Sequence, residues 1–160
     1  AILCRPCTVY GPGCTEGAGK VFSRRTSIPA IPGHGRQRLA NVRVEDVARA
    51  LVHLSDTSGA IGQVFNIADG SQPTLGQALT LAAEVFGSRP PRLHLPLGLL
   101  AVLARAQGFI AERRHTIPDL ESDAVRYLRD DYVVDGSKLT ATGFELRYPD
   151  FETSLAQMAV

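Results

Sequence analysis

Short apolar runs alternate along the chain with longer stretches in which apolar residues recur at helical spacing. The short runs predict strands at residues 1–4, 39–44, 63–68, 93–95 and 132–134. The helical spacing predicts helices at residues 16–25, 45–57, 75–86, 96–107, 118–129, 136–142 and 151–160. Residues 27–35 contain two Pro and two Gly, so a short extended piece and a turn are expected there. Strands that alternate with helices predict an α/β fold, with helices gathered toward the carboxyl end.

The first predicted strand runs into a rigid turn at residues 5–13, RPCTVYGPG. Pro6 and Pro12 fix their backbone angles, and Gly11 and Gly13 permit angles that other residues avoid. Loops at the carboxyl ends of strands bind ligands in open α/β sheets. The turn is therefore predicted to be a ligand loop. A buried strand at the very start, without an initiator Met, leads us to expect that further chain precedes it.

The composition is that of an ordinary globular protein. Its 160 residues fit one unit, residues 1–160, with 44% apolar and 21% charged residues. A net charge of +1 and few aromatic residues give no support for a nucleic-acid partner. The longest apolar patch, residues 93–104, is interrupted by His94, Pro96 and Gly98, so we expect no membrane span.

The three cysteines, Cys4, Cys7 and Cys14, lie close together near the amino end. An odd number of cysteines does not make a disulfide framework. Cys4 and Cys7 have metal-ligand spacing, but no second Cys pair or His pair completes a site. We therefore expect free thiols, no metal and a reducing compartment, which makes the protein cytoplasmic.

Known nucleotide-binding and catalytic patterns fail on spacing. A phosphate-binding loop ending at Lys20 would need Gly at position 14 and Ser or Thr at position 21, where the chain has Cys14 and Val21. The Gly-Pro-Gly of residues 11–13 does not continue as G-x-G-x-x-G, because position 16 is Glu. No Tyr is followed four residues later by Lys. The residues alone therefore identify no complete catalytic site.

Four segments, taken together, carry a resemblance to a known family. They are RPCTVYGPG at residues 5–13, NVRVEDVARA at 41–50, GQVFNI at 62–67, and DGSKL at 135–139 followed by Gly143-Phe144. In this order they resemble the carboxyl-terminal half of the extended short-chain dehydrogenase/reductases, also called the NAD-dependent epimerase/dehydratase family. The resemblance covers nearly all of the chain.

The resemblance implies a partial Rossmann-type parallel sheet, formed by its carboxyl-terminal strands, and a mostly helical substrate-binding lobe. It implies NAD or NADP as the cofactor, with Pro6, Cys7, Thr8 and Val9 against the nicotinamide. In the family, the glycine-rich loop and the Tyr-x-x-x-Lys pair lie upstream of the turn. The amino-terminal half is therefore expected to be missing from this chain, which alone should be inactive and should bind the cofactor weakly or not at all.

The substrate is expected to be a small molecule, with Tyr10, Lys20, Arg36 and Arg43 as candidate substrate-binding residues. In nucleotide-sugar members of the family an Arg clamps the diphosphate, and the aligned position here is Leu39. This difference favours a less polar alcohol or ketone, as in the sterol- and flavonoid-type members.

Two alternatives to this substrate class and activity stay open. One is a nucleotide-sugar epimerase or dehydratase of the same family. The other is a non-catalytic binding module whose sheet edge pairs with the missing half or with a second copy.

Overall fold

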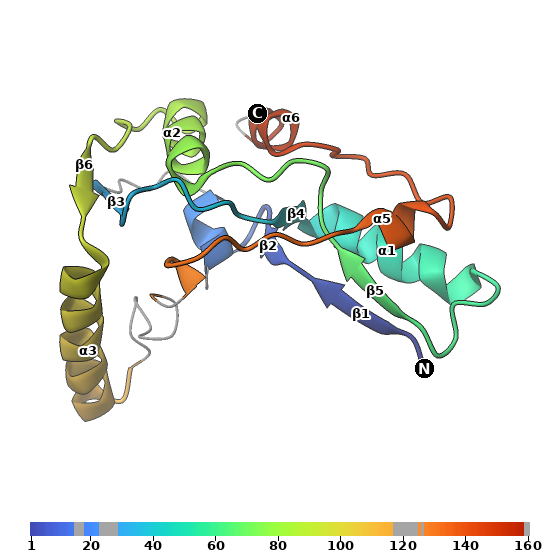
Figure 1. The fold of residues 1–160 in the computed structure, drawn as a ribbon, viewed down its shortest axis with the longest axis horizontal. Coiled ribbons are helices and arrows are strands. Elements are labelled where there is room, and N and C mark those ends of the chain that lie inside the picture. The colour runs from blue at the N-terminus through green and yellow to red at the C-terminus, as the bar shows by residue number, and fades with distance from the viewer. Residues whose placement is uncertain (15–17, 23–28, 117–124, 126, 159–160) are drawn as a thin grey trace.

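Three pairs of short parallel strands run through the structure (Figure 1). This computed structural model describes residues 1–14, 18–22, 29–116, 125 and 127–158. The strand pairs are β1 (Leu3–Pro6) with β5 (Val64–Ile67), β2 (Thr8–Tyr10) with β4 (Asn41–Arg43), and β3 (Ala30–Pro32) with β6 (Leu93–Leu95). The β3–β6 pair lies at the left-hand end in Figure 1, next to α3 (Leu97–Arg114). The α/β class and the parallel arrangement expected from the sequence are confirmed.

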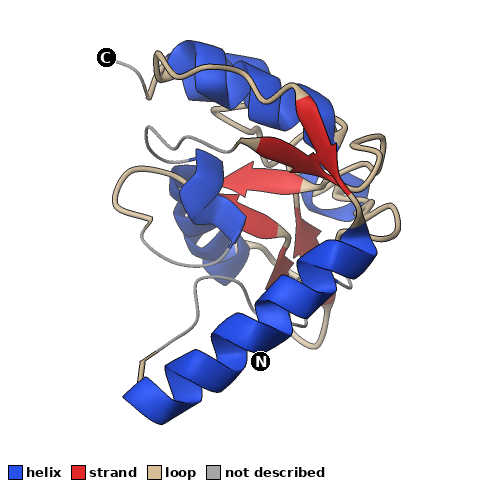
Figure 2. Cartoon of the chain, turned by 90° about the vertical axis from the view of Figure 1, so that its left-hand side faces the viewer, coloured by secondary structure: helices blue, strands red, loops and turns tan. Residues whose placement is uncertain are grey.

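Helices surround these strands, as Figure 2 shows, with the long α3 in front of them. They are the 3-10 helix η1 (Ala18–Phe22), α1 (Val44–Asp56), α2 (Leu75–Val85), α3 (Leu97–Arg114), α5 (Ser137–Thr140) and α6 (Phe151–Ala156). The start of α2 is a capping box, in which Thr74 and Gln77 satisfy each other's backbone N–H groups. The helix predicted at residues 75–86 is thus confirmed as α2.

Some elements differ from the sequence expectation. α3 continues to Arg114 instead of ending near residue 107, because residues 109–114 are good helix formers and two arginines suit its carboxyl end. The strand expected at 132–134 is reduced to a single bridge between Leu39 and Tyr132. Most of the helix expected at 118–129, and parts of the one at 16–25, lie outside the described residues.

β1 is more exposed than the buried strand that the sequence predicted. Leu3 on β1 is 50% exposed, and Val64, its partner on β5, is 37% exposed. The reason is that β1 pairs with β5 alone, and no other strand among the described residues covers its second edge. The β1–β5 pair thus presents apolar side chains and backbone groups of the kind that a neighbouring strand covers.

Two main hydrophobic clusters hold the elements together. The first joins β1, β4, β5, α1 and α5, and its fully buried members include Val42, Leu54, Ile67 and Leu139. The second joins β2, η1, α2 and α6 around Tyr10, Leu79, Phe151 and Leu155. The strand β2 therefore lies between the two clusters, which fixes the position of the turn that follows it.

A buried carboxylate attaches the amino end of α1 to the carboxyl-terminal segment. Asp46 is 0% exposed. Its two oxygens accept hydrogen bonds from the backbone N–H groups of Arg147 (2.9 Å) and Tyr148 (2.8 Å), and Arg49 pairs with it at 2.6 Å. A negative charge in the first turn of a helix is also favoured by the helix dipole. Asp46 thereby fixes the β4–α1 junction against the chain that leads to α6.

None of the helices in the described part of the chain is long and apolar enough to cross a membrane.

Candidate functional site

The predicted ligand turn begins where the first strand changes its hydrogen-bonding partner. The N–H of Cys7 donates to the carbonyl of Ile67 in β5 (3.0 Å), and the N–H of Thr8 donates to the carbonyl of Ala40 (3.3 Å). Pro6 is exposed, Thr8 and Val9 are half-buried, and Cys7 is buried. The break between β1 and β2 thus lies at the carboxyl end of the β1–β5 pair, the position at which open α/β sheets bind ligands.

Two glycines shape the turn around this backbone. Gly11 follows β2 with a φ of +154°, which other residues rarely adopt. Gly19 in η1 packs so closely on β2 that a Cβ atom there would collide with the carbonyl oxygen of Val9. The close approach of η1 therefore fixes the position of Val9. The side chain of Lys20 lies outside what the structure describes.

The Cys7 thiol is a packing group. Its burial, and then the nearby Asp69 carboxylate, raise its pKa from 9.0 to about 12. A thiol with so high a pKa stays protonated and is neither a nucleophile nor a metal ligand at neutral pH. The described residues contain no group of three or more His, Cys, Asp or Glu side chains placed to hold a metal ion. Cys7 therefore packs in the first hydrophobic cluster, and its contact with nicotinamide stays a prediction.

Asp69 is a buried acid that the sequence did not identify as a candidate site residue. It lies two residues after the end of β5, is 5% exposed, and accepts hydrogen bonds from the Ser71 N–H (3.0 Å) and hydroxyl (3.3 Å) through Oδ1. Its Oδ2 is buried without a hydrogen-bond partner. Burial raises the pKa of this carboxyl from 3.8 to about 7. In the sequence, Asp69-Gly70 has the composition of a turn. The signal that could have identified Asp69 is its position after a core strand, which places a polar side chain at the carboxyl edge of the sheet.

The raised pKa of Asp69 predicts an unusual pH dependence of stability. Between about pH 4 and 7 the folded protein holds a proton on Asp69 that the unfolded chain has lost. This group therefore makes the free energy of unfolding fall as pH rises through that window, by at most about 1.4 kcal/mol per pH unit. Asp69→Asn, which stays neutral, should gain stability relative to the wild type between pH 5 and pH 8 in urea titrations.

Urea titrations of Asp56→Asn, an exposed acid near the end of α1, provide the matched control and should show no such gain. An equal difference between Asp69→Asn and the wild type at both pH values would show that Asp69 is ionised in the fold throughout.

Tyr10 and Arg43 face each other in the parallel β2–β4 register, but both are buried. Tyr10 is 1% exposed and its ring packs edge-on against Phe151, with centroids 5.2 Å apart. The Arg43 guanidinium makes two bonds to Glu45 (2.8 and 2.9 Å) and one to the Ser154 carbonyl (2.7 Å). In this conformation both side chains hold the fold, and their contact with substrate stays a prediction.

Arg36 lies apart from Tyr10 and Arg43. It is exposed in the turn after β3, where its backbone N–H donates to Nδ1 of His34 (3.0 Å). Leu39, the residue aligned with the diphosphate-clamping Arg, is half-buried and belongs to the second cluster. The four predicted substrate residues thus do not form one described group.

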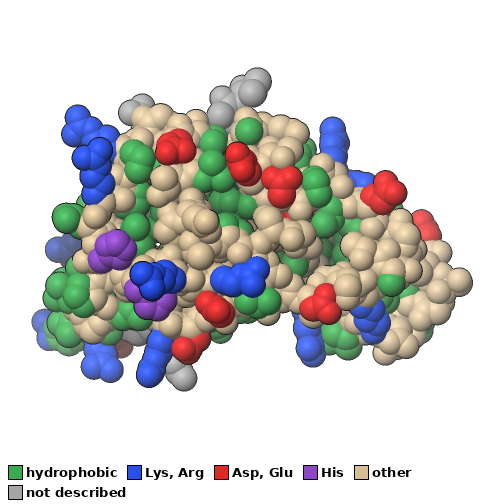
Figure 3. Space-filling view, turned by 45° about the horizontal axis from the view of Figure 1, so that its top comes forward, with side chains coloured by type: hydrophobic (Ala, Val, Ile, Leu, Met, Phe, Trp, Pro, Cys, Tyr) green, Lys and Arg blue, Asp and Glu red, His purple; other side chains and the backbone are tan. Residues whose placement is uncertain are grey.

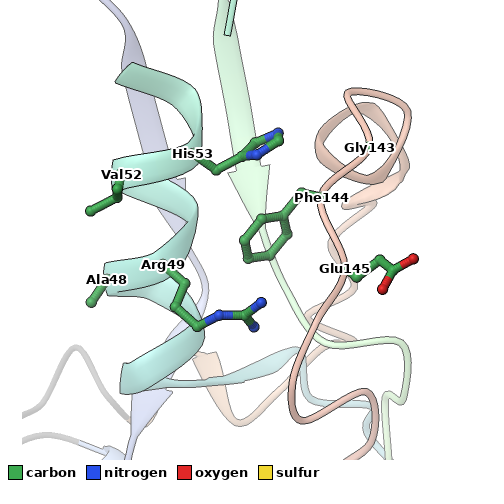
Figure 4. A pocket seen from close by; sticks show the side chains of 7 residues that line it. All are labelled: Ala48, Arg49, Val52, His53, Gly143, Phe144 and Glu145. Atoms are coloured by element: carbon green, nitrogen blue, oxygen red, sulfur yellow. The ribbon is translucent and has the colours of Figure 1, made fainter. Parts of the chain in front are cut away.

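A groove of about 630 Å³ lies on a different part of the molecule (Figure 4). It is formed by Ala48, Arg49, Val52 and His53 of α1 and by the loop at residues 143–145. The Phe144 ring reaches toward α1, 5.3 Å from the Arg49 guanidinium and 5.4 Å from the His53 ring. None of residues 6–9 lines the groove. The contacts in it are those with which the loop at residues 143–145 packs on α1.

Comparison with known proteins gives one relative by sequence and several by structure. No family model matches the sequence. The chain is 33% identical over 99 residues to ceramide reductase of Caulobacter vibrioides, a match that spans 60% of this chain and 30% of that protein. This match alone is too short to define a family.

Solved structures match almost the whole chain. A human epimerase family protein with NADPH has a TM-score of 0.69 and 22% identity, over 99% of this chain and 48% of its own. UDP-glucose 4-epimerase of Thermotoga maritima with UDP-glucose has a TM-score of 0.63 and 22% identity, over 99% of this chain and 44% of its own. The chain thus spans less than half the length of these proteins. The resemblance drawn from its motifs is confirmed at the level of the fold: the chain has the Rossmann-type fold of the NAD-dependent epimerase/dehydratase proteins.

Proposed function

We propose that this chain forms the nicotinamide-facing and substrate-facing part of an NAD(P)-dependent enzyme of the extended short-chain dehydrogenase type. The observation that carries the proposal is the change of strand partner at Cys7. It places residues 6–9 at the carboxyl end of a parallel strand pair, where open α/β sheets bind ligands. The fold similarity to a structure that contains NADPH supports the same site.

Residues 6–9 provide shape and backbone groups to this site. Pro6 fixes the backbone, Val9 gives apolar surface, and Thr8 adds a hydroxyl, while the buried Cys7 supports the backbone from the core. A bound nicotinamide would supply or accept the hydride. The proton donor and the phosphate-binding loop must come from chain outside these 160 residues, because no Tyr here is followed four residues later by Lys. The chain is therefore a half-site, which the preceding segment completes.

The proposed substrate is a weakly polar ketone or alcohol. The half-buried Leu39 offers no guanidinium for a diphosphate, and the relative with 33% identity is a ceramide reductase. The second candidate is a nucleotide-sugar epimerase, which is favoured by the fold similarity to UDP-glucose 4-epimerase.

Turnover by the full-length protein distinguishes these functions. The protein is mixed with NADH or NADPH and either a long-chain ketone or a UDP-hexose, and both nicotinamide absorbance and sugar products are followed. We expect cofactor oxidation with the long-chain ketone. Epimerisation of a UDP-hexose without ketone reduction would exclude the proposed substrate class. Failure of the full-length protein to bind either cofactor would exclude the proposed function.

A further inference from the structure

The helix α3 carries apolar side chains on a buried face and on a broad part of its exposed side. The buried face packs on the protein through Leu100, Ala104 and Ala111. At 100° per residue, five further apolar side chains span an arc of about 120° on the exposed side, which we call the outer stripe. The outer stripe consists of Leu99, Val102, Leu103, Phe109 and Ile110, which are between 46% and 61% exposed. A cluster of exposed large apolar side chains on a protein surface marks a site of interaction, so we expect the outer stripe to have an occupant.

Positive charge is concentrated on the same part of the chain. Residues 89–115 contain five arginines and one acid, Glu112, which gives this segment a net charge of +4. The whole chain carries +1, so the remaining residues together carry −3. All five arginines are exposed: Arg89, Arg92, Arg105, Arg113 and Arg114. The end of the molecule that holds α3 and β6, at the left of Figure 3, shows basic, histidine and apolar side chains together.

The arginines lie beside the apolar side chains. The guanidinium of Arg113 lies 4.4 Å from the centre of the Phe109 ring, at the edge of the outer stripe. Leu93 on β6, the strand that leads into α3, is 69% exposed and stands beside the exposed Arg92. Long cationic side chains that flank apolar ones can place their charged ends at a polar boundary while the apolar groups leave water.

We propose that α3 binds the surface of an anionic lipid bilayer through the outer stripe. The apolar side chains enter the boundary between headgroups and acyl chains, and the arginines contact lipid phosphates. The helix lies along the surface and does not cross it. The charge argues against a second copy as the occupant, because two segments of +4 would be brought together. This inference is independent of the proposed catalytic function.

Vesicle sedimentation with the full-length protein tests the proposal. The probes are phosphatidylcholine vesicles with and without phosphatidylserine, at low and high salt. We expect binding to the phosphatidylserine vesicles at low salt, and weaker binding to neutral vesicles or at high salt. A wild-type protein that does not bind phosphatidylserine vesicles would overturn the proposal.

Three double variants separate the stripe from the charge. Val102→Ser with Phe109→Ser should weaken binding about tenfold or more, because two apolar side chains no longer leave water. Arg113→Gln with Arg114→Gln should weaken the part of vesicle binding that is sensitive to salt. Leu51→Ser with Val52→Ser changes similarly exposed apolar residues on α1, outside the basic segment of residues 89–115, and should bind like the wild type.

All these substitutions are at exposed positions, and circular dichroism checks that each variant folds. Equal binding by the stripe variant and the wild type would overturn the proposal. The proposal would also be overturned if the wild-type protein were a dimer that does not bind vesicles and the stripe variant were a monomer. The occupant of the outer stripe would then be a second copy.

Discussion

Asp46→Ala should lower the free energy of unfolding by about 3–5 kcal/mol, which is the largest single-residue effect that we expect. The carboxylate is fully buried and accepts two backbone N–H groups, from Arg147 and Tyr148. Its removal leaves the buried Tyr148 N–H without a partner, at a cost of about 1–3 kcal/mol, and also removes the partner of the part-buried Arg147 N–H. It also removes a negative charge from the first turn of α1. Urea unfolding followed by circular dichroism measures the change.

Asp56→Ala provides the matched control for Asp46→Ala. Asp56 is the last residue of the same helix and is exposed, so its removal should change the free energy of unfolding by less than about 0.5 kcal/mol. If both variants lost equally little stability, Asp46 would not hold α1 to the carboxyl-terminal segment.

Arg43→Ala should lower the free energy of unfolding by about 2–4 kcal/mol. Its guanidinium is buried, bonds to Glu45 and to the Ser154 carbonyl, and lies 4.3 Å from the centre of the Tyr148 ring. Removal leaves a cavity and a buried carbonyl without its donor. Arg43→Lys should recover only part of the loss, because an ammonium group cannot make the two-bonded contact with Glu45.

Arg38→Ala is the control for Arg43→Ala, and thermal and urea unfolding measure the stability of both variants. Arg38 is exposed, and its side chain makes one 3.3 Å contact with the Gln72 carbonyl. Its loss should cost less than about 0.5 kcal/mol. Near-neutral behaviour of Arg43→Ala would mean that the guanidinium is free to turn toward substrate, as the sequence suggested.

Local sequence signals predicted most of the secondary structure. The Thr-x-x-Gln at residues 74–77 formed the predicted start of α2, and Leu93-His94-Leu95 formed the short strand β6. Local signals failed where tertiary contacts decided the outcome. Val133 and Val134 have strand propensity, yet only Tyr132 in this stretch makes a bridge, to Leu39.

The turn predicted at residues 5–13 is shorter in the structure, because Arg5 and Pro6 belong to β1 and residues 8–10 form β2. Pro6 marks the end of β1, and the Gly-Pro-Gly of residues 11–13 marks the end of β2. The burial of Tyr10 and Arg43 depends on α6, which lies more than a hundred residues further along the chain. No local pattern reveals such a contact. The same holds for Asp69, whose environment is made by elements far apart in the sequence.

Hydrogen exchange of the full-length protein, with and without NADP⁺ or NAD⁺, tests most directly whether residues 6–9 face the nicotinamide. We expect cofactor to slow exchange in peptides that contain the amides of residues 7–10, while peptides from α2 in the second cluster stay unchanged. Cofactor that binds and protects other segments, but leaves residues 7–10 exchanging at the same rate, would contradict the proposed half-site.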